Sequence, residues 1–509
     1  MRLRGARGRS VPQAARRYST IAAHGAQRRF AIQQAEVFGR RAVELSTPGN
    51  ERNEALETLG DIHYLALRGN PAWNAYTSAL RELDGIVPED PPRFARIAAK
   101  ATMIPTRWIG TMEEEVPPDE IAGVLEAGLR AAGERDSRER AMLLSARAFL
   151  AGTADRSAES DVADRSAREA VAMAQRLGDP NLVSAAMDAR AVVLWPTGRY
   201  GEISGLDRAR LELIGDLSDV REIADILLSA GRDLTRVGEY EEALGYLDRA
   251  ADSVEGIDPG QYVHTLVHRS ATLFFLGKWD EALADLAQIE ALETISEEEI
   301  PAYAVRAVGI AYFCSQLRGQ TGDAERYLTV LRAYRDRIER VGFGALDALD
   351  PLTVPARAVA HSGHVPEAMT WLNLKRGPGL SEHLEAACDI AALSSELDWA
   401  AEILAKSREE VAYAGVRALE HYAERLDGNI KAASEDRTAA VDRLLTSAEG
   451  FSSLGARWEE ACSRLSAGRV LTEDGASTQA LNQFKRALPV FEELQSVREA
   501  RLCREATSS

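Results

Sequence analysis

The sequence predicts an all-α fold, an α-solenoid of antiparallel helical hairpins with a repeat period of about 40 residues. Three observations predict it. Apolar residues follow helical periodicity almost from end to end, strand-like alternation is nearly absent, and one pattern of small, aromatic and apolar residues recurs at regular intervals. Only 6% of the residues are aromatic, so Ala and Leu supply most of the apolar filling, which favours closely packed helices.

The clearest repeat unit lies at residues 227–250. It contains, in order, Leu227, Ala230-Gly231, Leu234, Gly238, Tyr240, Ala243, Leu247 and Ala250. The small residues let two helices approach closely, the glycine ends the first helix, and the aromatic residue fills the gap between hairpins. This order matches the tetratricopeptide (TPR) consensus.

Further copies of the unit surround it. Their marker residues in the second helix lie 40, 39, 42 and 44 residues apart, at Ile203, Ala243, Ala282, Ala324 and Ala368. The C-terminal part repeats with an offset of 40 at five positions, which pair Ala440 with Ala480, Leu444 with Phe484, Phe451 with Phe491, Leu454 with Leu494, and Glu459 with Glu499. A standard TPR has about 34 residues and HEAT or armadillo units about 40 to 47. Because the spacing inside each motif is TPR-like, we predict a TPR-like solenoid with long helices rather than a HEAT array.

Short clusters of Pro, Gly and acidic residues divide the helical segments. We predict a basic flexible N-terminal tail at 1–20, irregular helical hairpins at 21–150, TPR-like repeats at 151–375 and C-terminal TPR-like repeats at 376–505. In the N-terminal third, Leu59-Gly60 reads as a first-helix pair that is followed by Trp73, Tyr76 and Leu80 on the next helix.

One C-terminal stretch carries a family resemblance. The residues Ala448, Phe451 and Leu454-Gly455-Ala456-Arg457-Trp458-Glu459-Glu460-Ala461 resemble the C-terminal TPR region of large bacterial signalling ATPases. These include regulators like the maltose-regulon activator and ATPase-linked class III nucleotide cyclases. The resemblance implies a sensor or docking arm in bacterial signalling or transcription regulation. Neither an ATPase nor an output domain is recognisable in this chain, so no functional residue carries over.

Motifs for catalysis are absent from the sequence. The only Gly-Lys pair, Gly277-Lys278, lacks the upstream glycine of a phosphate-binding loop, because that position is Thr272. His264 and His268 stand four apart, which can suit a metal, but no third ligand is evident, so packed helix histidines are the favoured interpretation. We therefore expect no enzyme activity, no catalytic residue, no cofactor and no metal.

Charge and composition restrict the partners. The net charge is −18, and since residues 1–35 hold eight Arg and no acid, the rest carries −26. An acidic body disfavours nucleic acid and favours a protein or peptide partner, possibly basic.

No apolar run reaches the roughly 20 residues of a membrane span. The four Cys form no paired motif, which is typical of a reducing cytoplasm, and the dominance of Arg over Lys favours a bacterial source. The Arg-rich start also imitates a mitochondrial presequence, with a plain basic tail as the alternative.

The repeat geometry predicts where a partner would bind. The inner face of a TPR superhelix comes mainly from the first helix of each hairpin, and counting back three or six residues from the turn glycines gives a putative concave binding face of Trp195, Arg232, Thr235, Phe274, Phe313 and Arg357. Aromatic and Arg side chains are common interface anchors. The alternative is that the aromatic residues fill hairpin contacts and the arginines are solvated.

Three functions remain open from the sequence. The first is a non-catalytic scaffold or sensor arm for protein–protein interaction. The second is a ligand-binding regulatory subunit of an enzyme such as an ATPase or nucleotide cyclase, which a deep pocket with convergent polar groups would support. The third is nucleic-acid binding through the basic N-terminus, which would be lost on deleting residues 1–35.

Overall fold

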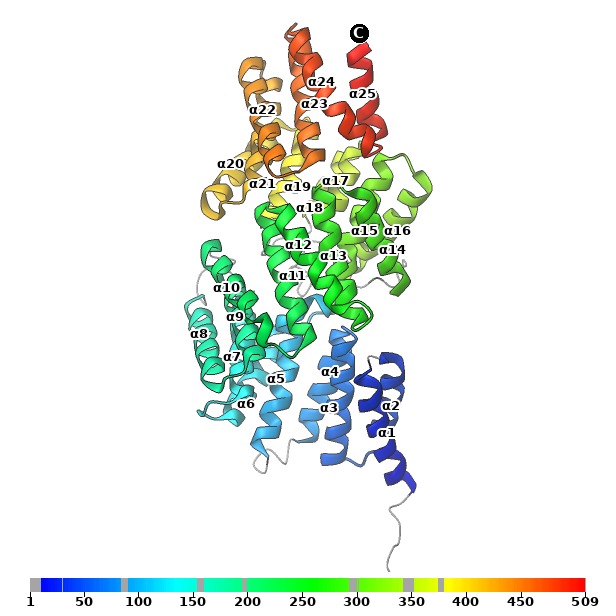
Figure 1. Cartoon of the computed structure of the whole chain (residues 1–509), viewed down its shortest axis with the longest axis vertical. Coiled ribbons are helices and arrows are strands. Elements are labelled where there is room, and N and C mark those ends of the chain that lie inside the picture. Colours follow the sequence, from blue (N-terminus) through cyan, green and yellow to red (C-terminus); the bar gives the residue numbers. More distant parts are fainter. Residues whose placement is uncertain are drawn as a thin grey trace, which may run out of the picture. The chain divides into compact units, whose positions relative to one another are not determined.

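The structure of the chain is a computed structural model, which describes residues 11–29, 31–83, 90–152, 160–194, 199–292, 300, 302–341, 352–373 and 380–508. Within these residues 25 α-helices follow one another as antiparallel hairpins (Figure 1). The predicted all-α, TPR-like solenoid is thus confirmed. The chain forms two compact units, of which unit 1 comprises residues 1–197, 208–222 and 256–261, and unit 2 comprises 198–207, 223–255 and 262–509.

Unit 1 contains the first nine helices: α1 (Val11–Gln27), α2 (Ile32–Glu44), α3 (Asn50–Leu65), α4 (Gly69–Glu82), α5 (Pro91–Arg107), α6 (Pro118–Ala132), α7 (Arg138–Gly152), α8 (Ser160–Leu177) and α9 (Pro180–Leu194). Three helices have residues in both units: α10 (Tyr200–Leu213), α11 (Val220–Val237) and α13 (Pro259–Phe275). As predicted, Trp73, Tyr76 and Leu80 are buried on α4.

Unit 2 contains the remaining helices: α12 (Tyr240–Val254), α14 (Trp279–Leu292), α15 (Val305–Leu317), α16 (Thr321–Val341), α17 (Thr353–His361), α18 (Val365–Asn373), α19 (Leu380–Leu393), α20 (Leu397–Ala414), α21 (Arg417–Ala433), α22 (Arg437–Ser453), α23 (Arg457–Glu473), α24 (Ser477–Glu493) and α25 (Val497–Ser508). The five marker residues predicted for the second helix of each hairpin are all buried.

Close helix packing in the hairpins depends on glycine. In four hairpins a glycine of the first helix faces a large side chain sixteen residues later: Gly60 faces Tyr76, Gly231 faces Leu247, Gly428 faces Leu444, and Gly468 faces Phe484. A Cβ atom at any of these glycines would lie 2.5 or 2.6 Å from that side chain, closer than packed atoms approach. The two helices therefore need a residue without a Cβ at the contact.

The turn between the helices of a hairpin is set by a second glycine. Gly277 has a φ of 72°, a left-handed conformation that glycine adopts without a steric penalty. Its neighbour Lys278 donates its backbone N–H to the Leu273 carbonyl at 2.8 Å, which closes the last turn of α13 as a Schellman motif. The predicted turn glycines 238, 319 and 363 also have positive φ, and Gly198 lies outside the described residues.

In unit 2 the C-terminal helices return to the earlier hairpins. Arg318, after α15, donates its Nε to the Leu494 carbonyl at 3.1 Å, and Arg498 on α25 donates to the His361 carbonyl at 3.1 Å. The Trp458 ring at the start of α23 lies 5.2 Å, centroid to centroid, from Trp279. The C-terminal repeats thus cover the turn end of the preceding hairpins, a contact that a simple open solenoid does not make.

Candidate functional site

The first helices of the unit 2 hairpins carry a row of charged and imidazole side chains on one face. We call this row the inner face, and it comprises Arg232 and Arg236 of α11, His264 and His268 of α13, Arg306 of α15, Arg357 of α17, and Glu382, Glu385 and Asp389 of α19. Within one helix these residues are three or four positions apart, which places them on the same side. Contacts between helices confirm the arrangement, because Arg236 Nε lies 3.5 Å from a Glu382 carboxylate oxygen and Arg306 pairs with the other oxygen.

A small pocket opens on the inner face, with a volume of about 20 Å³, which is room for about one water molecule. Its lining comes from Ala271, Phe274 and Phe275 of α13, Arg306 and Ile310 of α15, Thr353, Val354 and Arg357 of α17, and Glu382, Glu385 and Ala386 of α19. The walls are apolar apart from two Arg, two Glu and one Thr. Such a combination, an apolar cavity with a few convergent polar groups, is typical of binding sites.

Beside the pocket lies a closed ring of four buried charges, which we call the ion ring. Arg357 donates to Asp389 at 2.8 Å and to Glu459, while Arg425 donates to Glu459 at 2.8 Å and to Asp389 at 2.7 Å. All four side chains are 4% exposed or less, and they come from α17, α19, α21 and α23. Each charge therefore has two opposite partners, which is the condition under which buried ions are tolerated.

The ion ring fixes the charge state of its acids. Burial by itself would raise the pKa of Asp389, but the positive charges beginning with Arg357 outweigh it and hold this pKa well below its usual value. The pKa of Glu459 is likewise lowered by Arg357 and Arg425 against the effect of burial. His361 adds a contact at 3.0 Å from its Nε2 to Asp389. Asp389 and Glu459 are therefore ionised in the folded chain, and the ion ring is a structural element.

Glu385 differs from the other acids of the inner face. Its side chain is 8% exposed, and among the described residues it has no hydrogen bond and no ion pair. Burial, reinforced by the negative charge of Glu382, raises the pKa of Glu385 to about 8. At neutral pH the carboxyl group is therefore largely protonated and can donate a hydrogen bond into the pocket.

The two histidines of the inner face, His264 and His268, lie about one helical turn apart on α13. Their ring centroids are 5.1 Å apart, and burial lowers the pKa of His264 to about 4 and that of His268 well below its usual value. Both rings are therefore neutral at physiological pH. In the part of the chain that the structure describes, no group of three or more His, Cys, Asp or Glu is arranged to hold a metal ion.

The residues predicted for the concave binding face occupy different environments. Phe274 and Phe313 are buried and pack edge to face with centroids 5.0 Å apart, and Trp458 covers Phe313 at 5.9 Å. Arg357 is buried in the ion ring, yet both it and Phe274 line the pocket. Trp195 lies outside the described residues.

The two remaining predicted residues belong to α11. Arg232 is half-buried and donates its Nε to Asp233 at 3.0 Å. The Thr235 hydroxyl lies 2.8 Å from the Gly231 carbonyl oxygen and 2.7 Å from the Thr272 hydroxyl. Of the predicted residues that the structure describes, Arg232 and Thr235 are thus the two that are half-buried rather than buried.

Sequence reasoning did not single out the acids of α19 or Arg425. No glycine lies between the end of α19 and the start of α20, so counting back from turn glycines could not find Glu382, Glu385 or Asp389. Their signal is an acid at helical spacing within an otherwise apolar segment, which is unusual for a buried helix face. The sequence marks Glu459 as a repeat position and as part of the stretch 448–461, but not as a partner of arginine. Its repeat counterpart Glu499 instead accepts a hydrogen bond from the Ser496 hydroxyl.

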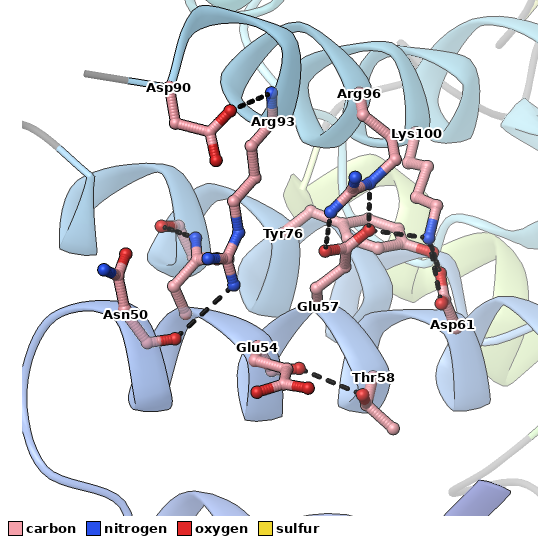
Figure 2. A network of polar contacts seen from close by, with 12 residues as sticks. Asn50, Glu54, Glu57, Thr58, Asp61, Tyr76, Asp90, Arg93, Arg96 and Lys100 are labelled. Carbon is pink, nitrogen blue, oxygen red and sulfur yellow. Dashed lines mark hydrogen bonds and ion pairs between the residues drawn. The ribbon is translucent and has the colours of Figure 1, made fainter. Parts of the chain in front are cut away.

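Unit 1 holds a polar network of its own between α3, α4 and α5 (Figure 2). Glu57 accepts two hydrogen bonds from Arg96 at 3.0 Å and one from Lys100 at 2.9 Å. Lys100 also contacts Asp61, which accepts a hydrogen bond from the Tyr76 hydroxyl at 2.7 Å. Burial would raise the pKa of Glu57, but the Arg96 hydrogen bond and the Lys100 charge outweigh it, so this pKa is lowered. The charges of Glu57, Asp61, Arg96 and Lys100 are thus paired with one another, and this network joins the three helices.

No helix among the described residues has the length and apolarity that a membrane crossing requires. No protein-family model matches the sequence, and the search of curated proteins found no match.

Three solved structures with helical repeats are similar in part. The crystal structure of Rap protein complexed with competence and sporulation factor has a TM-score of 0.47 and 15% identity, over 75% of this chain and 100% of that chain. The APC/C hetero-tetramer Cut9–Hcn1 has a TM-score of 0.46 and 11% identity, over 98% and 96%. Yeast Tom70 has a TM-score of 0.33 and 13% identity, over 91% and 96%. At these low scores, the all-α, TPR-like fold of this chain rests on its own hairpin geometry, and the fold is one that commonly serves as a protein-interaction scaffold.

Proposed function

We propose that the chain is a non-catalytic interaction scaffold or sensor arm whose inner face in unit 2 binds an extended peptide or a helix of a partner protein. The observation that carries this proposal is the pocket on the inner face, lined by apolar groups and by convergent Arg and Glu side chains. A helical-repeat fold supports it, because such folds present extended surfaces rather than catalytic centres. A fold by itself does not define a function, but the apolar, Arg and Glu side chains of this pocket are groups that can bind a partner protein.

The cellular role is part of the same proposal. The abundance of Arg over Lys and the unpaired Cys support a bacterial cytoplasmic protein. The resemblance of residues 448–461 to the repeat arms of bacterial signalling ATPases supports a role in signalling or transcription regulation. The net charge of −18 supports a partner segment with basic character and disfavours nucleic acid.

A photo-crosslinking experiment tests the inner face. A display library of random peptides is first selected on the full chain. Arg232 is then replaced by benzoylphenylalanine, and the matched control carries the same residue in place of Arg249, an exposed arginine on the second helix α12. We expect the selected peptides to crosslink at position 232 and not at 249. Crosslinking at 249 alone, or failure of any peptide to bind the full chain, would refute the proposal.

A second candidate is a regulatory subunit that holds a small ligand. It is favoured by the convergence of Arg306, Arg357, Glu382 and Glu385 on the pocket. Native mass spectrometry of the chain purified from its own cells tests this function. A stoichiometric mass increment that disappears on denaturation would support the second candidate, and its absence would favour the scaffold.

A further inference from the structure

The first hairpin of unit 1 carries apolar side chains that no described helix covers. Helix α1 packs against α2 and α3, and Figure 1 shows this hairpin in dark blue beside α3 and α4. Towards these contacts Ala23 and Ala26 of α1 are fully buried. Away from them Tyr18 is 72% exposed and Ile21 is 54% exposed. Together with Gly25, one turn further on, these two side chains form a stripe at helical spacing, which we call the outer face of α1.

The repeat register relates this outer face to a buried face of the next hairpin. The turn after α1 closes with a hydrogen bond from the Ala31 N–H to the Ala26 carbonyl, and the turn after α3 closes in the same way from Arg68 to His63. Superposing the two turns gives an offset of 37 residues (63 minus 26). With this offset, Tyr18, Ile21 and Gly25 of α1 correspond to Ala55, Thr58 and Ile62 of α3.

The counterparts on α3 are covered by the preceding hairpin. They are 1%, 5% and 0% exposed. Ile62 packs in one core cluster with Ala23 of α1 and Ala35 of α2. The Thr58 hydroxyl oxygen lies 3.2 Å from Nε2 of His24 on α1. In a helical-repeat array each unit buries its face against its neighbours, so the outer face of α1 is the surface on which a further helix would pack.

The surroundings of the outer face are basic. Arg17 and Arg28 are exposed and lie within about one turn of the stripe, and neither has an ion pair within the described part of the chain. Residues 1–35 hold eight Arg and no acid, and the first acid, Glu36, is already paired with two arginines. A partner surface with acidic groups would therefore be attracted here, whereas the same face of a second copy would be repelled.

An anionic membrane fits this surface less well than a helix does. A helix that lies in a membrane surface needs a broad apolar face, but the exposed large apolar side chains of α1 are Tyr18 and Ile21 alone among its described residues. Gly25 leaves space beside them, since a Cβ atom there would meet only an Arg29 nitrogen, at 3.9 Å. A narrow stripe with a small residue suits the close approach of another helix.

We propose that the outer face of α1 is a docking site for an amphipathic helix of a partner protein, one that has an apolar stripe flanked by acidic residues. The partner helix packs on α1 as the α1–α2 hairpin packs on α3, and so extends the solenoid. Tyr18 and Ile21 supply the apolar contact, and Arg17 and Arg28 pair with the acidic flanks. Because this surface belongs to unit 1, the proposal is independent of the inner face in unit 2.

A display library of helical peptides tests the proposal on the full chain. Each peptide has about 18 residues, or about five helical turns, with Leu and Ala along one side and Glu, Lys or Gln at random on the flanks. In the peptides that bind, we expect Glu to exceed Lys on the flanks by about tenfold. The net charge of −18 would by itself enrich Lys, so a preference for Glu has to arise at a locally basic surface.

Two variants locate the binding. Replacing both Tyr18→Gln and Ile21→Gln removes the apolar contact and should abolish binding of the selected peptides. The matched control is Val497→Gln on α25, which removes an apolar side chain that is 59% exposed and should leave binding unchanged. Substitutions at such exposed positions cost little stability, so the fold is kept. Replacing both Arg17→Glu and Arg28→Glu should reverse the preference from Glu to Lys.

The proposal would be overturned by enrichment of Lys, by the absence of a charge preference, or by failure of any peptide to bind. Equal binding of the Glu-rich peptides to the Tyr18→Gln, Ile21→Gln variant would place their site elsewhere and would overturn it too. Vesicles of equal parts phosphatidylglycerol and phosphatidylcholine test the membrane alternative. Co-sedimentation with these vesicles that the variant loses, without enrichment of Glu in the library, would assign the outer face to an anionic membrane instead of a helix.

Discussion

The protonation of Glu385 makes the stability of unit 2 depend on pH in a way that one substitution removes. In the folded chain the pKa of Glu385 is raised to about 8, against an ordinary value of 4.5, because the carboxyl group is buried and lies near Glu382. Between these two pH values the folded chain holds a proton that the unfolded chain has lost. The free energy of unfolding therefore falls as pH rises from 4.5 through about 8. It levels off at higher pH, because the carboxylate is then ionised in both states.

The size of this effect follows from the shift. The shift in the pKa of Glu385 from 4.5 to about 8 corresponds to roughly 5 kcal/mol of stability, of which roughly half is lost between pH 6 and pH 9. Glu385→Gln cannot ionise, so the variant should lack this part of the pH dependence. In a large domain a loss of 1 kcal/mol lowers the melting temperature by about 2 °C. The melting temperature of the unaltered chain should therefore fall by about 5 °C more than that of the variant between pH 6 and pH 9.

Differential scanning calorimetry of both proteins at four pH values from 6 to 9 measures this difference. Glu409→Gln, which removes an exposed glutamate of α20, is the matched control and should follow the unaltered chain. If Glu385→Gln and the unaltered chain show the same pH dependence, Glu385 is ionised in the folded chain and the reasoning about an unpaired neutral acid is wrong.

Three further predictions concern stability. Arg425→Met leaves Asp389 and Glu459 of the ion ring with one cation between them, so urea denaturation should show a loss of about 3–5 kcal/mol, and a loss below about 1 kcal/mol would contradict a closed ring. Phe274→Ala removes a ring that is 2% exposed and should cost about 3–5 kcal/mol in the same assay, whereas an accessible groove residue would cost little. Gln495→Gly relieves a non-glycine residue held at a φ of 61° and should raise the free energy of unfolding by about 0.5 kcal/mol, with no gain expected if the turn relaxes.

The repeat fold could be predicted because its signals are local. The close approach of Gly231 to Leu247 and the turn at Gly277 each depend on residues within one hairpin, so spacing along the chain reveals them. The ion ring could not be predicted in the same way. Glu459 lies 102 residues from its partner Arg357, and this contact forms because the C-terminal repeats return to the earlier hairpins. Helical periodicity fixes which side of a helix a residue occupies, but not which distant hairpin will cover that side.

The same return of the chain explains why only part of the predicted concave face remains open. A straight solenoid would leave Phe313 facing a groove, whereas Trp458 packs against it here and turns that stretch of the face into core. The pocket lies where the walls are mostly apolar, beside the paired charges of the ion ring. Residues that break a rule of stable folding, such as a buried acid, concentrate at functional sites, because selection for stability alone would remove them. Glu385, a buried and largely protonated acid on the wall of a pocket, is such a departure, which supports the proposal that the inner face binds a partner.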